Sequence, residues 1–414
     1  MCLIDIQNVS EKEKKVPMKR FYKYICTLLI CILFLGGCTT TSGDKKEIVI
    51  WSHLTDAEIS ELRILADKWS ETSGYKVKIH SDKGDNRAYI EASERGMEPD
   101  IEFGVSHDRM EKLNSEKLLA EVPDNLIDRN KYVSSSLETV TFGNKMYGIP
   151  ISIETYGLYY NKNKVKKVPE TLEELISQGE KLGFQYDINN FYLSFPILQA
   201  NGAYIFKKQN GGYNVKDTGL NNEGAVKGYT MIRDMVQKYK LMPENIESIT
   251  ARNNFKNGET SFYISGSWDL EELNKSGLNY GVAAFPKYNG KQMMSFITSQ
   301  VVYVSSKSKH KEKDWELVKY LIDNSKEKLF NITGRIPPFK IDYNIKEVKN
   351  SEKLKTFIEQ SKYGEVLPNV SEIQALQDAN KIMMELTSGR ITPRECGKKI
   401  EKNILDFIVK EKQK

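Results

Sequence analysis

The sequence predicts an α/β protein with two lobes, and three observations support this fold class. Short apolar strands alternate with amphipathic helices after Lys46, a pattern typical of largely parallel sheets covered by helices. Two long extended segments, residues 144–165 and 292–305, have the length expected of passages between lobes. A chain of 414 residues is also long enough for two or three domains. Two lobes joined by more than one passage form a hinge, with a cleft between them.

The first helix is predicted by its capping signal and its spacing. Ile48–Ile50 form a short apolar strand, after which Thr55 and Glu58 have the spacing of a capping box. Apolar residues then follow helical spacing at Ile59, Leu62, Leu65, Ala66 and Trp69. Further strands are expected at 75–80 and 98–105, and a helix with its exit at 113–122. A second capping box, Thr171 with Glu174, opens another helix, and the C-terminal third is expected to be mainly helical.

Residues 1–37 have the features of an export signal. A basic head precedes an apolar run at 24–35, which is too short for a bilayer because spanning one takes roughly 20 residues. Met18 opens a better signal than Met1, so residues 1–17 are expected to be an upstream start-site artefact.

The signal ends in a lipoprotein pattern. Leu35-Gly36-Gly37-Cys38 matches the bacterial lipobox, so Cys38 is expected to carry two or three acyl chains, enough for stable membrane anchoring. Residues 38–46 would form the tether. A plain signal peptide with a chance cysteine is the alternative.

Composition and charge exclude several classes of function. The net charge of +5 falls to +2 without residues 1–37, and the basic residues form no patch or stripe, so no nucleic acid is expected as partner. Cys396 is the single cysteine after Cys38, so an internal disulfide is impossible. Common hydrolase, redox and dinucleotide motifs are absent, and the four histidines lack metal-ligand spacing. No metal or cofactor is therefore expected.

Several segments resemble a known family. Residues 98–122, 143–165, 168–175, 195–206, 255–270 and 279–286 resemble, in order and spacing, the bacterial extracellular solute-binding proteins of ABC importers, and in particular the members that bind maltose and maltodextrins. The similarity runs from about Glu47 to about Phe407. It implies a periplasmic-binding-protein-like clamshell that binds a ligand and catalyses nothing.

The resemblance also implies domain bounds and partners. The N-terminal lobe is expected at 47–152 plus 298–346, and the C-terminal lobe at 153–297 plus 347–414. The expected partners are a carbohydrate, favoured as a maltodextrin-like oligosaccharide, and the membrane permease subunits that receive it. The protein is expected to be a lipid-anchored, extracytoplasmic monomer. A surface sensor or adhesin, a binder of a non-sugar polar solute, and an exported glycosidase are the alternatives.

The resemblance carries site roles to individual residues. Trp268 falls on an aromatic that stacks on a sugar ring, and Tyr192 on a second stacking aromatic. Asp108 and Arg109 fall on a polar pair that bonds sugar hydroxyls, and Glu154 on a carboxylate at the base of the cleft. This set suits sugars, because flat aromatics cover the C–H faces and charged groups form the stronger hydrogen bonds to hydroxyls.

The remaining assignments include departures from the family pattern. Phe195 replaces a second cleft aromatic, and Asp85 and Asp56 lie near polar contact positions. Val105 stands where the maltose-binding pattern has a tryptophan, and Asn190 replaces a carboxylate. That pattern also has two aromatics and then an arginine at the places that Gln377, Asp378 and Lys381 occupy here. These losses count against maltodextrin itself and leave carbohydrate as the expected ligand.

Each site residue also has a structural alternative. Trp268 could seal the corner between a strand and a helix, and Tyr192 could belong to the core. Asp108 could cap the helix that begins there. Arg109 could pair with Glu102. A lone buried carboxylate at Glu154 would be costly, which favours a position at the cleft. The other tryptophans, Trp51, Trp69 and Trp315, are expected in the core.

Overall fold

The computed structural model describes residues 46–414 apart from 83, 210–211, 334, 341–349 and 412–414. Within it, Glu47–Lys414 form one compact unit. The expected signal at 1–37, Cys38 and the tether at 38–46 lie outside the described residues, except for Lys46. Across the described part of the chain, every helix is too short or too polar to span a bilayer.

The first sheet has the strand order β16-β15-β3-β1-β2, and β6 also pairs with β15. Its strands are β1 (Glu47–Ser52), β2 (Lys76–Ser81), β3 (Ile101–Ser106), β6 (Ile149–Glu154), β15 (Phe296–Val304) and β16 (Glu365–Val366). β1 pairs in parallel with β2 and β3, as strand–helix alternation predicts, because each crossover returns the chain to the same edge. β15 runs antiparallel to both β3 and β6, so the sheet is mixed rather than largely parallel.

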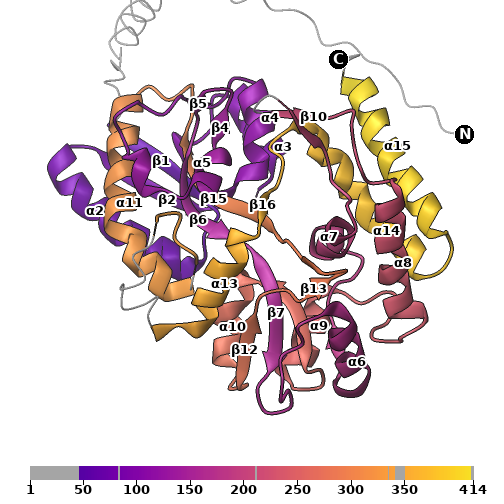
Figure 1. Ribbon diagram of the computed structural model, residues 1–414. Helices are drawn as coiled ribbons and strands as arrows, with labels where there is room; N and C mark the ends of the chain where they lie inside the picture. Colours follow the sequence, from indigo (N-terminus) through magenta and orange to yellow (C-terminus); the bar gives the residue numbers. More distant parts are fainter. Residues whose placement is uncertain (1–45, 83, 210–211, 334, 341–349, 412–414) are drawn as a thin grey trace, which may run out of the picture. The chain divides into compact units, whose positions relative to one another are not determined.

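Helices α2 (Asp56–Ser73) and α11 (Lys311–Thr333) pack against each other beside this sheet (Figure 1). The predicted capping box is confirmed, because the Thr55 hydroxyl accepts from the Glu58 amide and the Glu58 carboxylate accepts from the Thr55 amide. The predicted apolar face of α2 is buried as expected. Helices α3 (Asn86–Glu94), α4 (Met110–Ser115) and α5 (Ser134–Glu138) complete this half of the fold.

The second sheet has the strand order β12-β7-β11-β8. Its strands are β7 (Tyr156–Asn161), β8 (Phe184–Gln185), β11 (Phe262–Gly266) and β12 (Tyr280–Ala283). β7 is antiparallel to both neighbours, and β8 is parallel to β11. The Tyr159 ring contacts the rings of Phe255, Tyr263, Tyr280 and Phe357, which makes it the centre of an aromatic core.

Helices surround the second sheet. They are α6 (Leu172–Leu182), α7 (Phe191–Ala200), α8 (Glu223–Gln237), α9 (Ser248–Lys256), α10 (Leu270–Lys275), α13 (Glu352–Lys362), α14 (Ala379–Thr387) and α15 (Pro393–Glu411). α8, α14 and α15 contact one another (Figure 1). Three further strand pairs, β4–β5 (Thr141–Phe142, Lys145–Met146), β9–β10 (Lys207–Gln209, Gly212–Asn214) and β13–β14 (Lys287–Tyr288, Lys291–Gln292), form separate two-stranded sheets. The predicted helical character of the C-terminal third is confirmed.

Two hydrophobic clusters correspond to the two sheets. The cluster of the first sheet contains buried residues from Ile48 to Ile149 and from Val301 to Leu329. The cluster of the second sheet contains buried residues from Ile153 to Ile297 and from Ile336 to Ile408. The chain passes from the first sheet to the second between β6 and β7. In β15, Phe296 and Ile297 belong to the cluster of the second sheet, and residues 301–304 belong to the cluster of the first sheet. Both extended segments identified in the sequence therefore connect the two cores.

Two local predictions need correction. The helix expected at 113–122 is α4, which begins at Met110 and ends at Ser115, because Lys117 adopts a left-handed backbone with φ of 57°. At Thr171, the hydroxyl accepts from the Glu174 amide as expected, but the Glu174 carboxylate accepts from the Glu170 amide rather than from Thr171. In the second capping box, the hydrogen bond to the Glu174 carboxylate therefore comes from the residue before Thr171.

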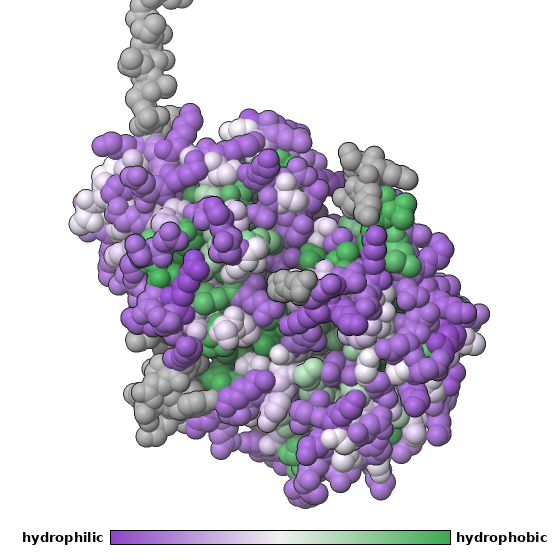
Figure 2. Space-filling model, turned by 45° about the horizontal axis from the view of Figure 1, so that its top comes forward, coloured by the Kyte–Doolittle hydropathy of each residue, from purple (hydrophilic) through white to green (hydrophobic). Residues whose placement is uncertain are grey.

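The surface agrees with a chain of which 28% of the residues are charged. Most of the face in Figure 2 is hydrophilic, and hydrophobic side chains are exposed there only in small groups. Burial of apolar area in the two clusters, rather than any disulfide, therefore stabilises the described unit.

A buried carboxyl at the start of α11 predicts a pH-dependent stability. Asp314 is fully buried and accepts a hydrogen bond from the Ser308 hydroxyl, and burial raises its pKa from 3.8 to about 6. The folded state then binds this proton more tightly than the unfolded state, so stability falls as the pH rises from about 4 to about 6. Asp314→Asn should remove this loss and stabilise the protein by about 1–3 kcal/mol at neutral pH.

Thermal unfolding at about pH 4 and about pH 7.5 measures the effect, and the advantage of Asp314→Asn should be present only at the higher pH. Glu316→Gln is the matched control, because Glu316 lies on the same helix with half of its side chain exposed. An equal advantage of Asp314→Asn at both pH values would contradict the prediction.

Candidate functional site

Three adjoining cavities lie within Glu47–Lys414, and they share wall residues. Cavity A encloses about 900 Å³, cavity B about 300 Å³ and cavity C about 130 Å³. Asn190 and Tyr192 line both A and B, and Trp268 lines both B and C. We refer to the three together as the cleft.

Cavity A lies between elements of the two sheets. Asp85, Asp108 and Arg109 line it from α3 and from the 3₁₀ helix His107–Arg109, which leads into α4. Asn190 and Tyr192 line it from the start of α7, with further residues from the 3₁₀ helix Ser371–Asp378 and from α14. The cavity therefore has charged groups from one half of the fold and an aromatic from the other.

Backbone contacts hold the charged wall of cavity A in place. Asp85 caps α3 by accepting from the Ala88 amide, and this bond lowers the pKa of Asp85. The Arg109 guanidinium donates to the Gly84 carbonyl at 2.7 Å, and the Asn86 side chain donates to the Arg109 carbonyl at 3.0 Å. Arg109 thus braces the loop before α3 and does not pair with Glu102.

Asp108 offers a hydrogen-bond acceptor to the cavity. Its Oδ1 is buried and accepts no hydrogen bond from any described residue. Its side chain caps neither the 3₁₀ helix nor α4, so the capping alternative is absent from this structure. A buried carboxylate oxygen without a partner is costly, and a ligand hydroxyl would satisfy it.

Tyr192 belongs to an aromatic stack that connects the cleft to the core. Its ring lies 5.3 Å from that of Phe296 at an interplanar angle of 28°, and Phe195 stacks on Phe296 at 4.5 Å and 18°. The Tyr156 hydroxyl donates to the Tyr192 carbonyl at 2.6 Å. Tyr192 is half-buried and lines the cleft, whereas Phe195 is 2% exposed and lies in the core beneath Phe296.

The turn that carries Trp268 is fixed by a buried carboxylate. β11 ends at Gly266, and a 3₁₀ helix follows at Ser267–Asp269. Asp269 accepts hydrogen bonds from Tyr263 and Ser265, both at 2.7 Å, and from Arg252 at 3.1 Å. These three bonds fix the conformation of the turn.

The indole of Trp268 lies over the backbone of Gly266. A Cβ added to Gly266 would lie 2.1 Å from a ring carbon of Trp268, so only glycine leaves room for the ring there. The Gly266 carbonyl also accepts from the Tyr159 hydroxyl at 2.6 Å, which joins the turn to the aromatic core. Trp268 nevertheless remains 45% exposed between cavities B and C. Its indole is therefore a supported, open platform rather than a seal.

Glu154 at cavity C is paired, contrary to the lone carboxylate considered from the sequence. Its Oε1 accepts from Arg335 at 3.1 Å and from Gln300 at 2.9 Å, and among the described residues no donor reaches its Oε2. Arg335 also holds Glu58 through two hydrogen bonds, at 2.6 and 3.1 Å. Burial raises the pKa of Glu154 despite the opposing charge of Arg335. Burial also favours a higher pKa for Glu58, but the bonds of Glu58 to Arg335 and Thr55 hold its pKa below the ordinary value.

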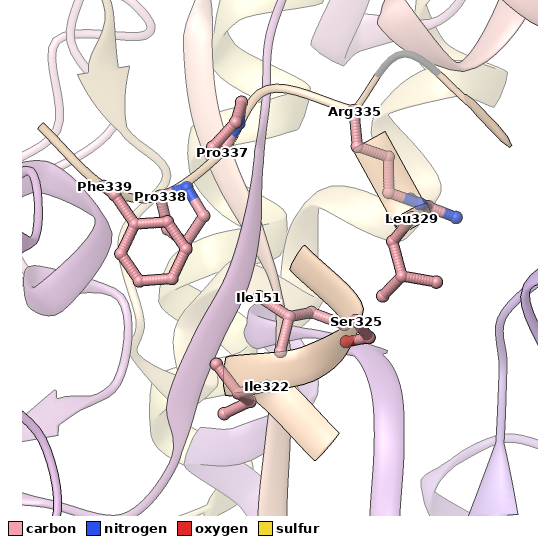
Figure 3. A pocket seen from close by; sticks show the side chains of 8 residues that line it. All are labelled: Ile151, Ile322, Ser325, Leu329, Arg335, Pro337, Pro338 and Phe339. Atoms are coloured by element: carbon pink, nitrogen blue, oxygen red, sulfur yellow. The ribbon is translucent and has the colours of Figure 1, made fainter. Parts of the chain in front are cut away.

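Arg335 begins a segment that is hydrogen-bonded to the chain at Ile153 and Val133. The Ile336 carbonyl accepts from the Ile153 amide, and the Pro338 carbonyl accepts from the Val133 amide, both at 2.8 Å. A small cavity of about 20 Å³, room for a water molecule and not for a sugar ring, lies between this segment, Ile151 and α11 (Figure 3). In that view the Arg335 guanidinium points away from Pro337, Pro338 and Phe339.

The structure brings most of the expected site residues to the cleft. Asp85, Asp108, Arg109, Glu154, Tyr192 and Trp268 all line it. Phe195 is a core residue, and Asp56 is exposed in the first turn of α2 next to Thr55, which does line cavity C. Sequence reasoning missed Arg335 and Gln300. The lone charge of Arg335 in an apolar stretch, "RIPPF", was the available signal for Arg335.

The donor set of the cleft suits a neutral polar ligand. Neither histidine nor cysteine is among the described residues that line the three cavities. The walls instead present aromatic faces, carboxylates, amides and guanidinium groups.

Gly266→Ala should displace the Trp268 indole while leaving the chain folded, because Gly266 has an ordinary φ of −98° and the three atoms nearest to an added Cβ all belong to the Trp268 ring. The tryptophan emission and near-UV circular dichroism spectra should change. Gly212→Ala is the control, since among the described residues its Cβ would meet only the Gln209 carbonyl, at 3.9 Å. The spectral change should vanish in a background that carries Trp268→Phe, and its persistence there would refute the assignment.

Comparison with known proteins identifies the family. Residues 65–356 match the family described as "Bacterial extracellular solute-binding protein". The chain is 32% identical to a galactooligosaccharide-binding protein of Bacillus subtilis, over 73% of this chain and 75% of the relative. It is 28% identical to a maltooligosaccharide ABC transporter solute-binding lipoprotein of Streptococcus pneumoniae, over 88% of this chain and 91% of the relative.

Solved structures agree with this result. The maltose-maltodextrin binding protein of Alicyclobacillus acidocaldarius matches with a TM-score of 0.82 and 30% identity, over 87% of this chain and 100% of that chain. A cyclo/maltodextrin-binding protein complexed with maltotetraose matches with a TM-score of 0.79 and 25% identity, over 89% and 99%. The expected two-lobed α/β fold is confirmed. The chain belongs to the bacterial extracellular solute-binding proteins.

Proposed function

We propose that this protein is the solute-binding component of an ABC importer and that it captures an oligosaccharide in the cleft. The observation that carries the proposal is the supported, half-exposed indole of Trp268 between two cavities, with carboxylates on the neighbouring walls. The relatives named for galactooligosaccharides and maltooligosaccharides support the same ligand class.

The chemistry of the cleft matches a sugar chain. An aromatic face binds the C–H groups of a pyranose at low entropic cost, and Trp268 and Tyr192 offer two such faces. Asp108 Oδ1 and Glu154 Oε2 are acceptors without a hydrogen-bond donor among the described residues, and they would bond sugar hydroxyls. Gln300 adds a buried carbonyl oxygen that also lacks a donor within the described chain.

The ligand is proposed as a maltodextrin-like chain. The solved structures that match are named for maltose and maltodextrins, and three adjoining cavities suit a chain better than a single ring. A galactooligosaccharide is the second candidate, favoured by the 32% identity to a protein named for it. A surface sensor or adhesin with the same fold is the alternative to the importer role.

The lobes are proposed at 47–152 plus 298–346 and at 153–297 plus 347–414. The two hydrophobic clusters support this division, with Ile336 as an exception because it packs in the second cluster. Closure of the lobes about the β6–β7 and β15 crossings would enclose the ligand.

The remaining assignments concern location and partners. We propose export by the signal at 1–37, lipid anchoring through Cys38, a monomeric state, permease subunits as partners and no catalytic activity. A relative named as an ABC transporter lipoprotein supports the anchor and the permease.

Trp268→Ala should weaken oligosaccharide binding by at least about 30-fold, because a central aromatic contact contributes about 2 kcal/mol or more. Isothermal calorimetry with maltotetraose and with a galactooligosaccharide, each recovered intact afterwards, measures this loss. Tyr363→Ala is the matched control, since Tyr363 is 47% exposed and lines none of the three cavities. Binding of neither sugar by the parent protein would overturn the oligosaccharide proposal.

Saturating oligosaccharide should reduce the radius of gyration in small-angle X-ray scattering, because lobe closure makes the protein more compact. Trp268→Ala at the same sugar concentration should show a smaller change. A radius that stays constant at calorimetric saturation would argue against closure and would leave binding itself established.

A further inference from the structure

A second cluster of polar side chains lies at the first sheet, outside the cleft. His53 follows β1, Asp82 follows β2 and Glu102 lies on β3. His53 Nε2 is 3.5 Å from Asp82 Oδ2 and 3.5 Å from Glu102 Oε1, and all three atoms lie within 4.8 Å of one another. None of the three residues lines cavity A, B or C.

Among the described residues, no basic side chain balances the two carboxylates of this cluster. The Glu102 side chain is only 4% exposed, and those of His53 and Asp82 are 10% and 28% exposed. Within the described chain, no lysine or arginine is ion-paired to Glu102 or Asp82, so two carboxylates share one imidazole. Buried charges in proteins are paired or bind metal ions, because an uncompensated charge is costly to desolvate.

The two separations from His53 Nε2 are long for hydrogen bonds and close to the spacing between ligands of one metal ion. N–H···O hydrogen bonds usually measure about 2.7–3.2 Å, shorter than both 3.5 Å separations. Tetrahedral zinc holds nitrogen and oxygen ligands at about 2.0–2.2 Å, which places neighbouring ligands about 3.4 Å apart. We propose that His53, Asp82 and Glu102 form a binding site for a divalent transition metal, with Zn²⁺ as the best fit and water as the fourth ligand.

The surroundings of the three residues support such a site. The Tyr303 hydroxyl donates to Glu102 Oε2, the oxygen not directed at His53, and so orients the carboxylate. Backbone bonds of 2.9 Å from the His53 amide to Phe103 and from the Asp82 amide to Ser52 fix the ends of the strands. Metal sites in proteins characteristically have ligands held by such outer hydrogen bonds. The more exposed Asp82 provides a path for metal and water.

The metal would act on one wall of the cleft. Asp82 begins the connection from β2 to α3, and that connection carries Gly84, the acceptor of Arg109, and Asp85, which lines cavity A. Coordination of Asp82 would join this connection to β1 and β3. The site is therefore structural, and it does not depend on the identity of the sugar.

The spacing of the histidines in the sequence gives no sign of this cluster. Its ligands lie on or directly after three different strands and are separated by 29 and 20 residues, whereas recognisable zinc motifs pair ligands a few residues apart. The parallel pairing of β2 and β3 with β1 brings them together.

Isothermal calorimetry of the EDTA-stripped, dialysed protein with ZnCl₂ tests the proposal. One Zn²⁺ should bind per chain, more weakly at acidic pH because protons compete for the ligands, and it should raise the melting temperature. His53→Ala and Asp82→Asn should abolish this binding. Tyr303→Phe should weaken it by about 10- to 100-fold, as expected for an outer hydrogen bond to a ligand.

His80→Ala is the matched control, because His80 is exposed and pairs with Trp51 in the same sheet, so it reports surface binding of zinc. This variant should bind zinc as the parent does. No zinc binding by the parent, or equal affinity in the parent, His53→Ala and Asp82→Asn, would overturn the proposal. Circular dichroism of Asp82→Asn, whose changed side chain is partly exposed, verifies that its loss of binding is not a loss of folding.

Discussion

The guanidinium of Arg335 between Glu58 and Glu154 is the interaction on which the arrangement of the cleft depends. It links the first turns of α2, the end of β6 and the segment after α11, three parts of the chain far apart in sequence. Two carboxylates share this single arginine. Removing one partner of such a buried pair typically costs about 3–5 kcal/mol, because the remaining charge stays buried and unpaired. The same pairing positions Glu154 at cavity C with one oxygen free of donors from the described residues.

The cleft combines rigid support with unsatisfied polar groups. Trp268 is held by the Asp269 network and by the shape of Gly266, and Tyr192 is held by its stack on Phe296. Since these rings are already ordered, a ligand loses little side-chain entropy when it covers them. Asp108 has the opposite character, with a buried oxygen that lacks a partner in the described chain until a ligand supplies one. The ordered rings thus provide a surface on which a ligand can stack, and the unsatisfied carboxylate oxygen favours ligands that donate a hydrogen bond to it.

Local signals in the sequence predicted the elements better than their connections. The Thr55–Glu58 box and the apolar face of α2 act within a few residues, so pattern alone was sufficient for them. The position of Trp268 after a strand was likewise visible in the sequence. The antiparallel course of β15, the burial of Phe195 and the pairing of Arg335 depend on contacts across more than a hundred residues. Asp108 illustrates the same limit, since its sequence position favoured capping and ligand contact equally.

The segment from Arg335 to Phe339 contacts both cores, beside the β6–β7 and β15 crossings, because Ile336 packs in one hydrophobic cluster and Phe339 packs against the other. Two bodies joined by a single strand can twist, slide and bend relative to each other. Two crossings, together with a segment that contacts both cores, remove most of these freedoms and leave bending about one axis as the soft motion. Fewer accessible arrangements of the unliganded protein mean less configurational entropy to lose on closure. The number of links between the two cores thus contributes to ligand affinity although none of them needs to contact the ligand.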